Sequence, residues 1–115
     1  MTLFSDGVSR ALDQALDGVA LRQRVVSQNI SNAMTPGYQA QSVAFESALA
    51  SAVREGDPGA VRPEVLPTGD FSREDGNNVR LEDEAALLLR SGLQYDALVQ
   101  ASNYRHKIYS TALSR

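Results

Sequence analysis

The chain has 115 residues and a mass of 12.4 kDa, which suits one small domain and excludes barrel and two-lobed enzymes. It contains no cysteine, so disulfide staples, thiol catalysis and Cys-ligated zinc are excluded. The 11 basic residues are scattered among 14 acidic ones, and the net charge is −3. Nucleic-acid-binding domains carry a basic stripe instead, so we expect no nucleic-acid partner.

Residues 1–35 are predicted to form an N-terminal helix, because apolar side chains between residues 6 and 33 recur at spacings of three and four. Ser5 and Asp6 precede this run and can cap its first turn. Gly18 is a weak point that costs about 1 kcal/mol relative to alanine. Four apolar positions are the predicted assembly seam of this helix: Leu12, Leu16, Val19 and Val26.

The helix is expected to end near Met34, because Thr35-Pro36-Gly37-Tyr38 follows. A residue that precedes proline is pushed out of the helical region. Pro-Gly suits the two central positions of a type II turn. The side chain of Asn32 can serve the last open carbonyls of the helix.

Residues 36–80 are predicted to be a turn followed by an irregular linker. The part from residue 47 to residue 80 holds three of the four prolines and four of the eight glycines, and such composition is typical of turns. Its larger apolar side chains are too few for a core of its own: Val61, Val65, Leu66 and Phe71. We therefore expect a loop, and its composition is compatible with disorder.

Residues 81–115 are predicted to form a long C-terminal helix, with three carboxylates at residues 82–84 placed favourably for the helix dipole. A heptad seam runs through Ala85, Leu88, Gly92, Tyr95, Val99, Ser102, His106, Tyr109 and Leu113. The members predicted to mediate assembly are Leu88, Gly92, Tyr95, Val99, His106 and Tyr109. Gly92 stands where a heptad expects a large apolar residue, so we expect a close approach between helices there.

The expected fold is all-α, with two long terminal helices forming a coiled-coil-like rod around an irregular middle loop. Helices of this length extend about 40–50 Å each. Two of them leave much apolar surface exposed, and large exposed apolar patches mark interaction surfaces. No apolar run approaches the roughly 20 residues of a membrane span, so the sequence predicts a part of an assembly without a membrane span.

No arrangement of residues predicts catalysis, a cofactor or a metal site. His106 is the single histidine, and no carboxylate lies three or four residues from it on either side. Aligning Gly76 and Glu82 with an EF-hand loop puts Phe71 and Arg73 at ligand positions, where neither can bind calcium. We therefore predict that the chain is not an enzyme.

Segments at both ends of the chain resemble bacterial flagellar rod and hook axial proteins. Residues 27–38 (SQNISNAMTPGY) resemble their N-terminal signature in Asn29, Ile30, Asn32 and the turn Thr35-Pro36-Gly37-Tyr38. Residues 40–46 (AQSVAFE), 75–82 (DGNNVRLE) and 93–100 (LQYDALVQ) are similar to segments of the proximal rod members. Met34 and Gln39 depart from the family pattern without touching the turn itself.

The resemblance implies a structural subunit of the proximal rod in the flagellar basal body, which transmits torque by packing with other rod proteins and copies of itself. It also implies export through the flagellar type III apparatus to the MS-ring region and periplasm, and no cleavable signal peptide is readable at the N-terminus. The alternatives are another rod paralogue of the same family, and a soluble coiled-coil adaptor or export chaperone.

Overall fold

The computed structural model describes residues 7–114, apart from the side chain of Ala60. Its elements are α1 (Gly7–Ser31), β1 (Gln41–Ala44), α2 (Glu46–Arg54), the 3-10 turn η2 (Pro58–Ala60), β2 (Glu64–Pro67) and α3 (Leu81–Leu113). The candidate capping residues Ser5 and Asp6 lie outside the described residues. α1 and α3 occupy the two segments in which the sequence pattern predicts long helices.

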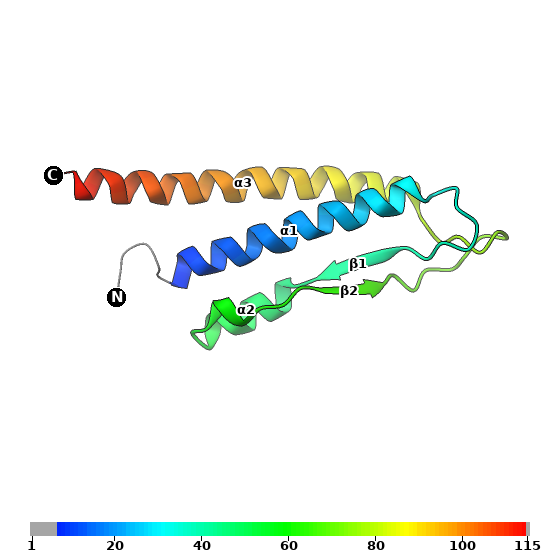
Figure 1. Cartoon of the computed structure of the whole chain (residues 1–115), viewed down its shortest axis with the longest axis horizontal. Helices are drawn as coiled ribbons and strands as arrows, with labels where there is room; N and C mark the ends of the chain where they lie inside the picture. The colour runs from blue at the N-terminus through cyan, green and yellow to red at the C-terminus, as the bar shows by residue number, and fades with distance from the viewer. Residues whose placement is uncertain (1–6, 115) are drawn as a thin grey trace.

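α1 is the middle layer of an elongated molecule that measures 65 × 26 × 14 Å. α3 runs antiparallel to α1 along one side, and the β1–β2 hairpin with α2 lies along the other side (Figure 1). One end of the molecule, here called the turn end, holds the end of α1, the loop of residues 68–80 and the beginning of α3. The opposite end holds the start of α1 and the end of α3.

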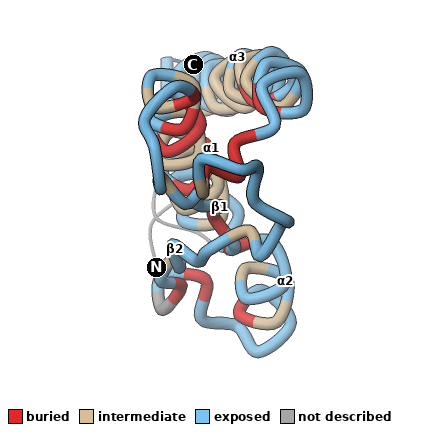
Figure 2. The backbone as a smooth tube through the Cα atoms, turned by 90° about the vertical axis from the view of Figure 1, so that its right-hand side faces the viewer, coloured by how far each residue is buried: buried red, intermediate tan, exposed pale blue. Residues whose placement is uncertain are grey.

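The core lies between these layers, where the buried segments of Figure 2 gather. The larger cluster joins valines of α1 to side chains of the hairpin: Val19, Val25, Val43, Phe45, Ala52 and Val61. Tyr95 and Leu98 of α3 pack against it. A smaller cluster at the turn end contains Ala33, Ala40 and Val79. Both clusters include α1 or the chain directly after it, so α1 holds the fold together.

Two long terminal helices packed as a rod confirm the predicted all-α fold class. The middle of the chain is more regular than an irregular loop, because β1 and β2 pair antiparallel in the register Gln41↔Pro67 to Ala44↔Glu64. All four residues of β2 are exposed, and Val43 and Phe45 turn inward onto α1. The segment has no core of its own. It is ordered by packing against the buried valines of α1, Val19 and Val25.

Candidate assembly interface

The chain reverses direction after α1 through the turn Thr35-Pro36-Gly37-Tyr38. The Tyr38 amide donates to the Thr35 carbonyl at 3.2 Å, and Gly37 has φ +77° at the third position. With proline at the second position, this is the geometry of a type II turn. Asn32 closes the end of the helix, because its Nδ2 donates to the Gln28 carbonyl at 2.8 Å.

Asn29 is the buried centre of the junction between α1, β1 and α3. It is 0% exposed, and its Nδ2 donates to the Gln41 carbonyl at 2.7 Å and to Glu84 Oε1 at 2.9 Å. Its Oδ1 accepts from the Gln41 amide at 3.1 Å and from the Tyr38 hydroxyl at 3.3 Å. The hydrogen bonds to both polar atoms of the buried amide offset the cost of its desolvation, so this side chain fixes where β1 leaves the turn.

Glu84 joins this junction from the first turn of α3 and is itself buried. Its Oε2 makes no hydrogen bond among the described residues, and no salt bridge to it is present there. Burial raises the pKa of this carboxyl above its ordinary value, and the Asn29 amide lowers it only in part. Nearby Asp83 and Asp70 add to the rise in pKa. The start of α3 is therefore attached to α1 through a buried carboxyl whose protonated form is favoured more than that of a solvated glutamate.

Asn77 attaches the loop before α3 to the end of α1. It is 0% exposed, and its Nδ2 donates to the carbonyls of Asn32 and Thr35, both at 2.8 Å. Its Oδ1 accepts from the Val79 amide at 2.7 Å. Asn77 thus adds a second donor to two carbonyls of the turn that follows α1, each of which also accepts a backbone amide.

Asn78 makes the corresponding link to β1. Its Oδ1 accepts from the Ala40 amide at 2.6 Å, and its Nδ2 donates to the Asp70 carbonyl at 3.0 Å. Arg73 completes the junction by donating to the carbonyls of Val79 and Ala33. The asparagine cluster (Asn29, Asn32, Asn77 and Asn78) therefore joins the motif of residues 27–38 to the motif of residues 75–82. The hydrogen bond from Asn77 to the Asn32 carbonyl spans 45 positions of the chain.

Phe45 docks on α1 at Gly18, a position that the sequence pattern marks only as a weak point. A Cβ added to Gly18 would lie 2.6 Å from the Phe45 ring, so a larger residue fits only if the ring moves. The Arg22 guanidinium lies 5.0 Å from the centre of the same ring and donates to both Glu46 oxygens, at 2.6 and 2.8 Å. The hydrogen bond from Arg22 lowers the pKa of Glu46 below its ordinary value.

The predicted seam residues lie mainly between α1 and α3. Val19 and Val26 are buried, and a further set is half-buried: Leu12, Leu16, Leu88, Gly92, Tyr95, Val99 and Tyr109. His106 is exposed. A Cβ on Gly92 would meet only Gln23 Nε2 at 3.7 Å, which is ordinary contact. The residues that α3 buries completely or nearly so are Ser91 and Glu84, and neither belongs to the predicted seam.

A second apolar surface crosses the face of α3 that points away from α1. We call it the outer ridge, and it consists of Leu81, Ala85, Leu89, Leu93, Ala97 and Ala101, which are four residues apart and all exposed. Leu89 is 69% exposed and Leu93 65%. Rows with this spacing form the ridges by which helices commonly pack into one another's grooves. No described residue of residues 7–114 covers the outer ridge.

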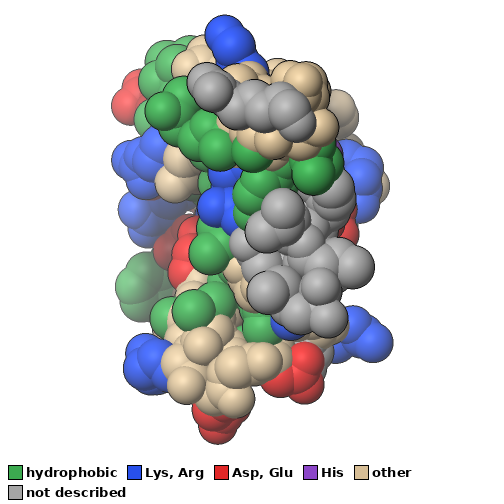
Figure 3. Space-filling model, turned by 90° about the vertical axis from the view of Figure 1, so that its left-hand side faces the viewer, with side chains coloured by type: hydrophobic (Ala, Val, Ile, Leu, Met, Phe, Trp, Pro, Cys, Tyr) green, Lys and Arg blue, Asp and Glu red, His purple; other side chains and the backbone are tan. Residues whose placement is uncertain are grey.

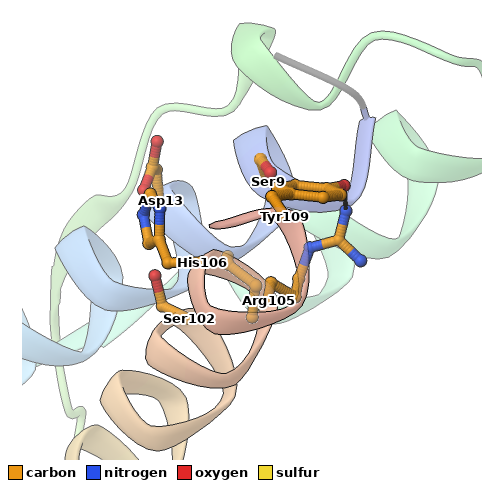
Figure 4. Close-up of a pocket in the computed structure, with 7 residues that line it drawn as sticks. Ser9, Asp13, Ser102, Arg105, His106 and Tyr109 are labelled. Atoms are coloured by element: carbon orange, nitrogen blue, oxygen red, sulfur yellow. Dashed lines mark hydrogen bonds between the residues drawn. The ribbon is translucent and has the colours of Figure 1, made fainter. Parts of the chain in front are cut away.

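A small pocket of about 140 Å³ lies between the start of α1 and the end of α3 (Figure 4). Its lining residues include Ser9 and Asp13 from α1 and Ser102, Arg105, His106 and Tyr109 from α3. Arg105 donates to the Tyr109 hydroxyl and lies 5.2 Å from the centre of that ring. No group of acidic, histidine or cysteine side chains within residues 7–114 could hold a metal ion.

No helix in the described part of the chain is both long enough and apolar enough to cross a bilayer. The features that remain are a polar junction, which fixes the backbone at the turn end, and apolar surface on α3. The polar junction positions α1, β1 and α3 relative to one another.

Comparison with known proteins gives no matching family model. Several relatives are nevertheless similar over most of the chain. The flagellar basal body rod protein FlgB of Bacillus subtilis is 30% identical over 134 residues, covering 99% of this chain and 98% of the relative. FlgB of Escherichia coli is 29% identical and covers 84% of this chain. FlgB of Borreliella burgdorferi is 26% identical and covers 85%.

The motifs at both ends of the chain, the antiparallel pair of long helices and the near-complete alignment with the Bacillus protein all indicate one assignment. The chain belongs to the FlgB family of flagellar basal body rod proteins.

Proposed function

We propose that this chain is a structural subunit of the proximal rod, which packs by its helices with copies of itself and with other rod proteins and so transmits torque along the rod. The observation that carries the proposal is the outer ridge of α3. Leucines at positions 81, 89 and 93 are all more than half exposed, and a continuous exposed apolar row of this kind is an interaction surface.

In this proposal the two apolar surfaces of α3 have different roles. The predicted seam residues hold α1 against α3, and the outer ridge meets the neighbouring subunit. The motif residues Asn29, Ile30, Asn32 and Thr35-Pro36-Gly37-Tyr38 fix the junction that aligns the two helices. The polar bonds of Asn29 and Asn77 support this role, because fully paired buried amides specify one backbone arrangement.

We further propose that the subunit passes through the flagellar type III export apparatus and joins the rod in the periplasm near the MS-ring, with its N-terminus retained. FlgB family membership supports this route. The intact mass of the protein recovered from purified basal bodies tests it. A mass that retains residues 2–115 is expected, and the loss of an N-terminal segment would contradict the proposal.

The packing role is tested by placing a charge on the outer ridge. We expect Leu89→Asp and Leu93→Asp to leave the helix content of the purified subunit unchanged, because both side chains already face solvent. Both variants should abolish motility and recovery in basal bodies, since an unpaired charge buried at an interface is strongly destabilising. Val53→Asp is the matched control, because Val53 on α2 is 50% exposed and lies off the ridge.

The control variant should remain motile. Motile cells carrying Leu89→Asp and Leu93→Asp would show that the outer ridge faces no neighbour, and the proposal would then be wrong.

A further inference from the structure

A groove of about 310 Å³ lies between α3 and the hairpin side of the molecule, with the middle layer α1 between them. All three layers contribute to its walls. Its lining residues include Arg22 and Val26 of α1, Val43 of β1, and Leu87, Arg90 and Gln94 of α3. A partner that enters this groove would therefore touch every layer of the fold.

The groove differs in this respect from the far end of α3. Hydrophobic side chains also gather over that end when the molecule is viewed along its length (Figure 3). The surface that includes Tyr104 and Ile108 is lined by residues of α3 alone, so it is the open face of one helix. A groove walled by several elements constrains the shape of its partner, as grooves that bind amphipathic helices do.

The floor of the groove is fixed by Arg22, whose side chain is 11% exposed. Its guanidinium donates to the Val43 carbonyl at 2.6 Å and to both carboxylate oxygens of Glu46. Val26 lies on the same floor and is 1% exposed. The floor is thus an apolar surface on which the charge of Arg22 is already matched by Glu46.

Arg90 on the α3 wall is different, because its charge has no counterpart. It is exposed and makes no hydrogen bond or ion pair with any described part of the chain. From residue 85 to residue 95, α3 carries no other charged side chain. An arginine that stands beside apolar surface favours a partner with a carboxylate, because guanidinium and carboxylate form strong paired hydrogen bonds.

The groove shares one edge of α3 with the outer ridge. Arg90 and Gln94 directly follow Leu89 and Leu93 of the ridge, so the two pairs form neighbouring rows on the helix. A helix that packs on the outer ridge can therefore reach the groove with its next row of side chains. This edge is not complementary to itself, because a second copy placed against it would bring Arg90 to face Arg90.

We propose that the groove binds an amphipathic helix of a different rod protein. A carboxylate of that helix faces Arg90, and its apolar side chains lie against Val26 and Leu87. The inference rests on the proposed rod function and names the chemistry of one partner that this function requires.

Reversing the charge of Arg90 tests the proposal. We expect Arg90→Glu to abolish motility and to reduce recovery of the chain in basal bodies by about tenfold or more, because like charges would then face each other. Arg90→Lys keeps the charge and should retain most of the motility. The matched control is Arg24→Glu, since Arg24 is exposed on α1 and does not line the groove. Circular dichroism should show unchanged helix content in all three variants.

A photoreactive residue identifies the partner in assembled basal bodies. Replacing Gln94 with p-benzoylphenylalanine places the reactive group about one helical turn from Arg90. We expect a cross-link to a different rod protein, which mass spectrometry should map to a helical segment that contains an aspartate or a glutamate. Changing that carboxylate to arginine should restore motility to the Arg90→Glu strain, because the ion pair then forms with its charges exchanged.

Four results would overturn the proposal: full motility of Arg90→Glu, an equal loss from Arg24→Glu, a cross-link from position 94 that is absent or joins two copies of this chain, or failure of the exchanged charges to restore motility. None of them removes the proposed rod function, because Leu89→Asp tests the outer ridge separately. A chain that fails here and still loses motility with Leu89→Asp would be a rod subunit whose groove has no partner.

Discussion

The ring of Phe45 occupies the space beside Gly18 in which a side chain would have to stand, at 2.6 Å from an added Cβ. Phe45 begins the segment that leads from β1 into α2, so this contact attaches the hairpin to the middle of α1. The Phe45 ring can pack directly on the backbone of α1 only because Gly18 has no side chain, even though a glycine weakens the helix at that position.

Two helical glycines of this chain should respond in opposite directions to the same substitution. Gly18→Ala gains helix propensity but must displace the Phe45 ring, and we expect a net loss of about 1–2 kcal/mol in the free energy of unfolding. Gly92→Ala meets only Gln23 Nε2 at 3.7 Å and should gain up to about 1 kcal/mol. Urea denaturation of both variants measures the difference, and a stabilised Gly18→Ala would contradict the packing argument.

Asn77 should be among the most sensitive polar positions of the chain. Asn77→Ala leaves the Val79 amide without its partner and removes one of the two donors to each of the Asn32 and Thr35 carbonyls, and unpaired buried groups are costly. We expect a loss of about 2–4 kcal/mol in the free energy of unfolding. Asn103→Ala on the exposed side of α3 is the control and should change stability by about 0.5 kcal/mol or less. Equal effects at the two positions would show that the bonds of Asn77 contribute little.

The raised pKa of Glu84 predicts a stability that falls as pH rises. The folded protein binds this proton more tightly than the unfolded chain does, so the stability decreases between the ordinary pKa of 4.5 and the higher pKa of the folded state. Glu84→Gln removes the titrating group while an amide oxygen can still accept from Asn29. The variant should gain stability relative to the natural chain as pH rises from about 4 to 7.5. A constant difference across this range would mean that Glu84 is solvated.

Glu46 should show the opposite dependence on pH. Its pKa is lowered by the hydrogen bond from Arg22, so its contribution is present above the ordinary value of 4.5 and is lost as pH falls through the lower folded value. The Glu46 side chain is 58% exposed, and solvent screening limits the effect to about 1 kcal/mol or less. Glu46→Gln should therefore be destabilised at neutral pH and match the natural chain in acid; a loss that persists in acid would count against the ion pair.

The helices of this fold could be predicted from the sequence because periodic apolar residues and Pro36-Gly37 are local signals. The β1–β2 hairpin could not be predicted in this way. β1 has only four residues, and it is ordered by packing against α1 rather than by a strand pattern in its own sequence. The heptad seam predicted on α3 overlaps the observed packed face at residues 88, 92, 95, 99, 102 and 109, whereas Ala85 and His106 of the seam are exposed. The burial of Ser91, which is 0% exposed, cannot be predicted from the apolar pattern, because a polar side chain gives no hydrophobic signal.

The polar junction was visible in the sequence only as a resemblance. Nothing in the spacing of Asn29, Asn77 and Asn78 indicates that they meet, because residues 30–76 intervene and their path depends on the tertiary fold. Gly18 could be predicted only in part. The cost of a glycine to the helix follows from the local sequence, whereas the ring that requires a glycine there belongs to Phe45, 27 positions later.

The side-chain to main-chain bonds of Asn77, Asn78 and Arg73 fasten the start of α3 directly to the end of α1, so the position of α3 does not depend on the length of chain between them. The turn that joins α2 to η2 is exposed, and Gly56 within it has open space around it at φ +82°. The alignment with the Bacillus relative extends over 134 residues, against 115 in this chain. Insertions and deletions at this turn would leave the helical rod undisturbed, which makes residues 55–57 the natural place to insert a tag or a reporter domain.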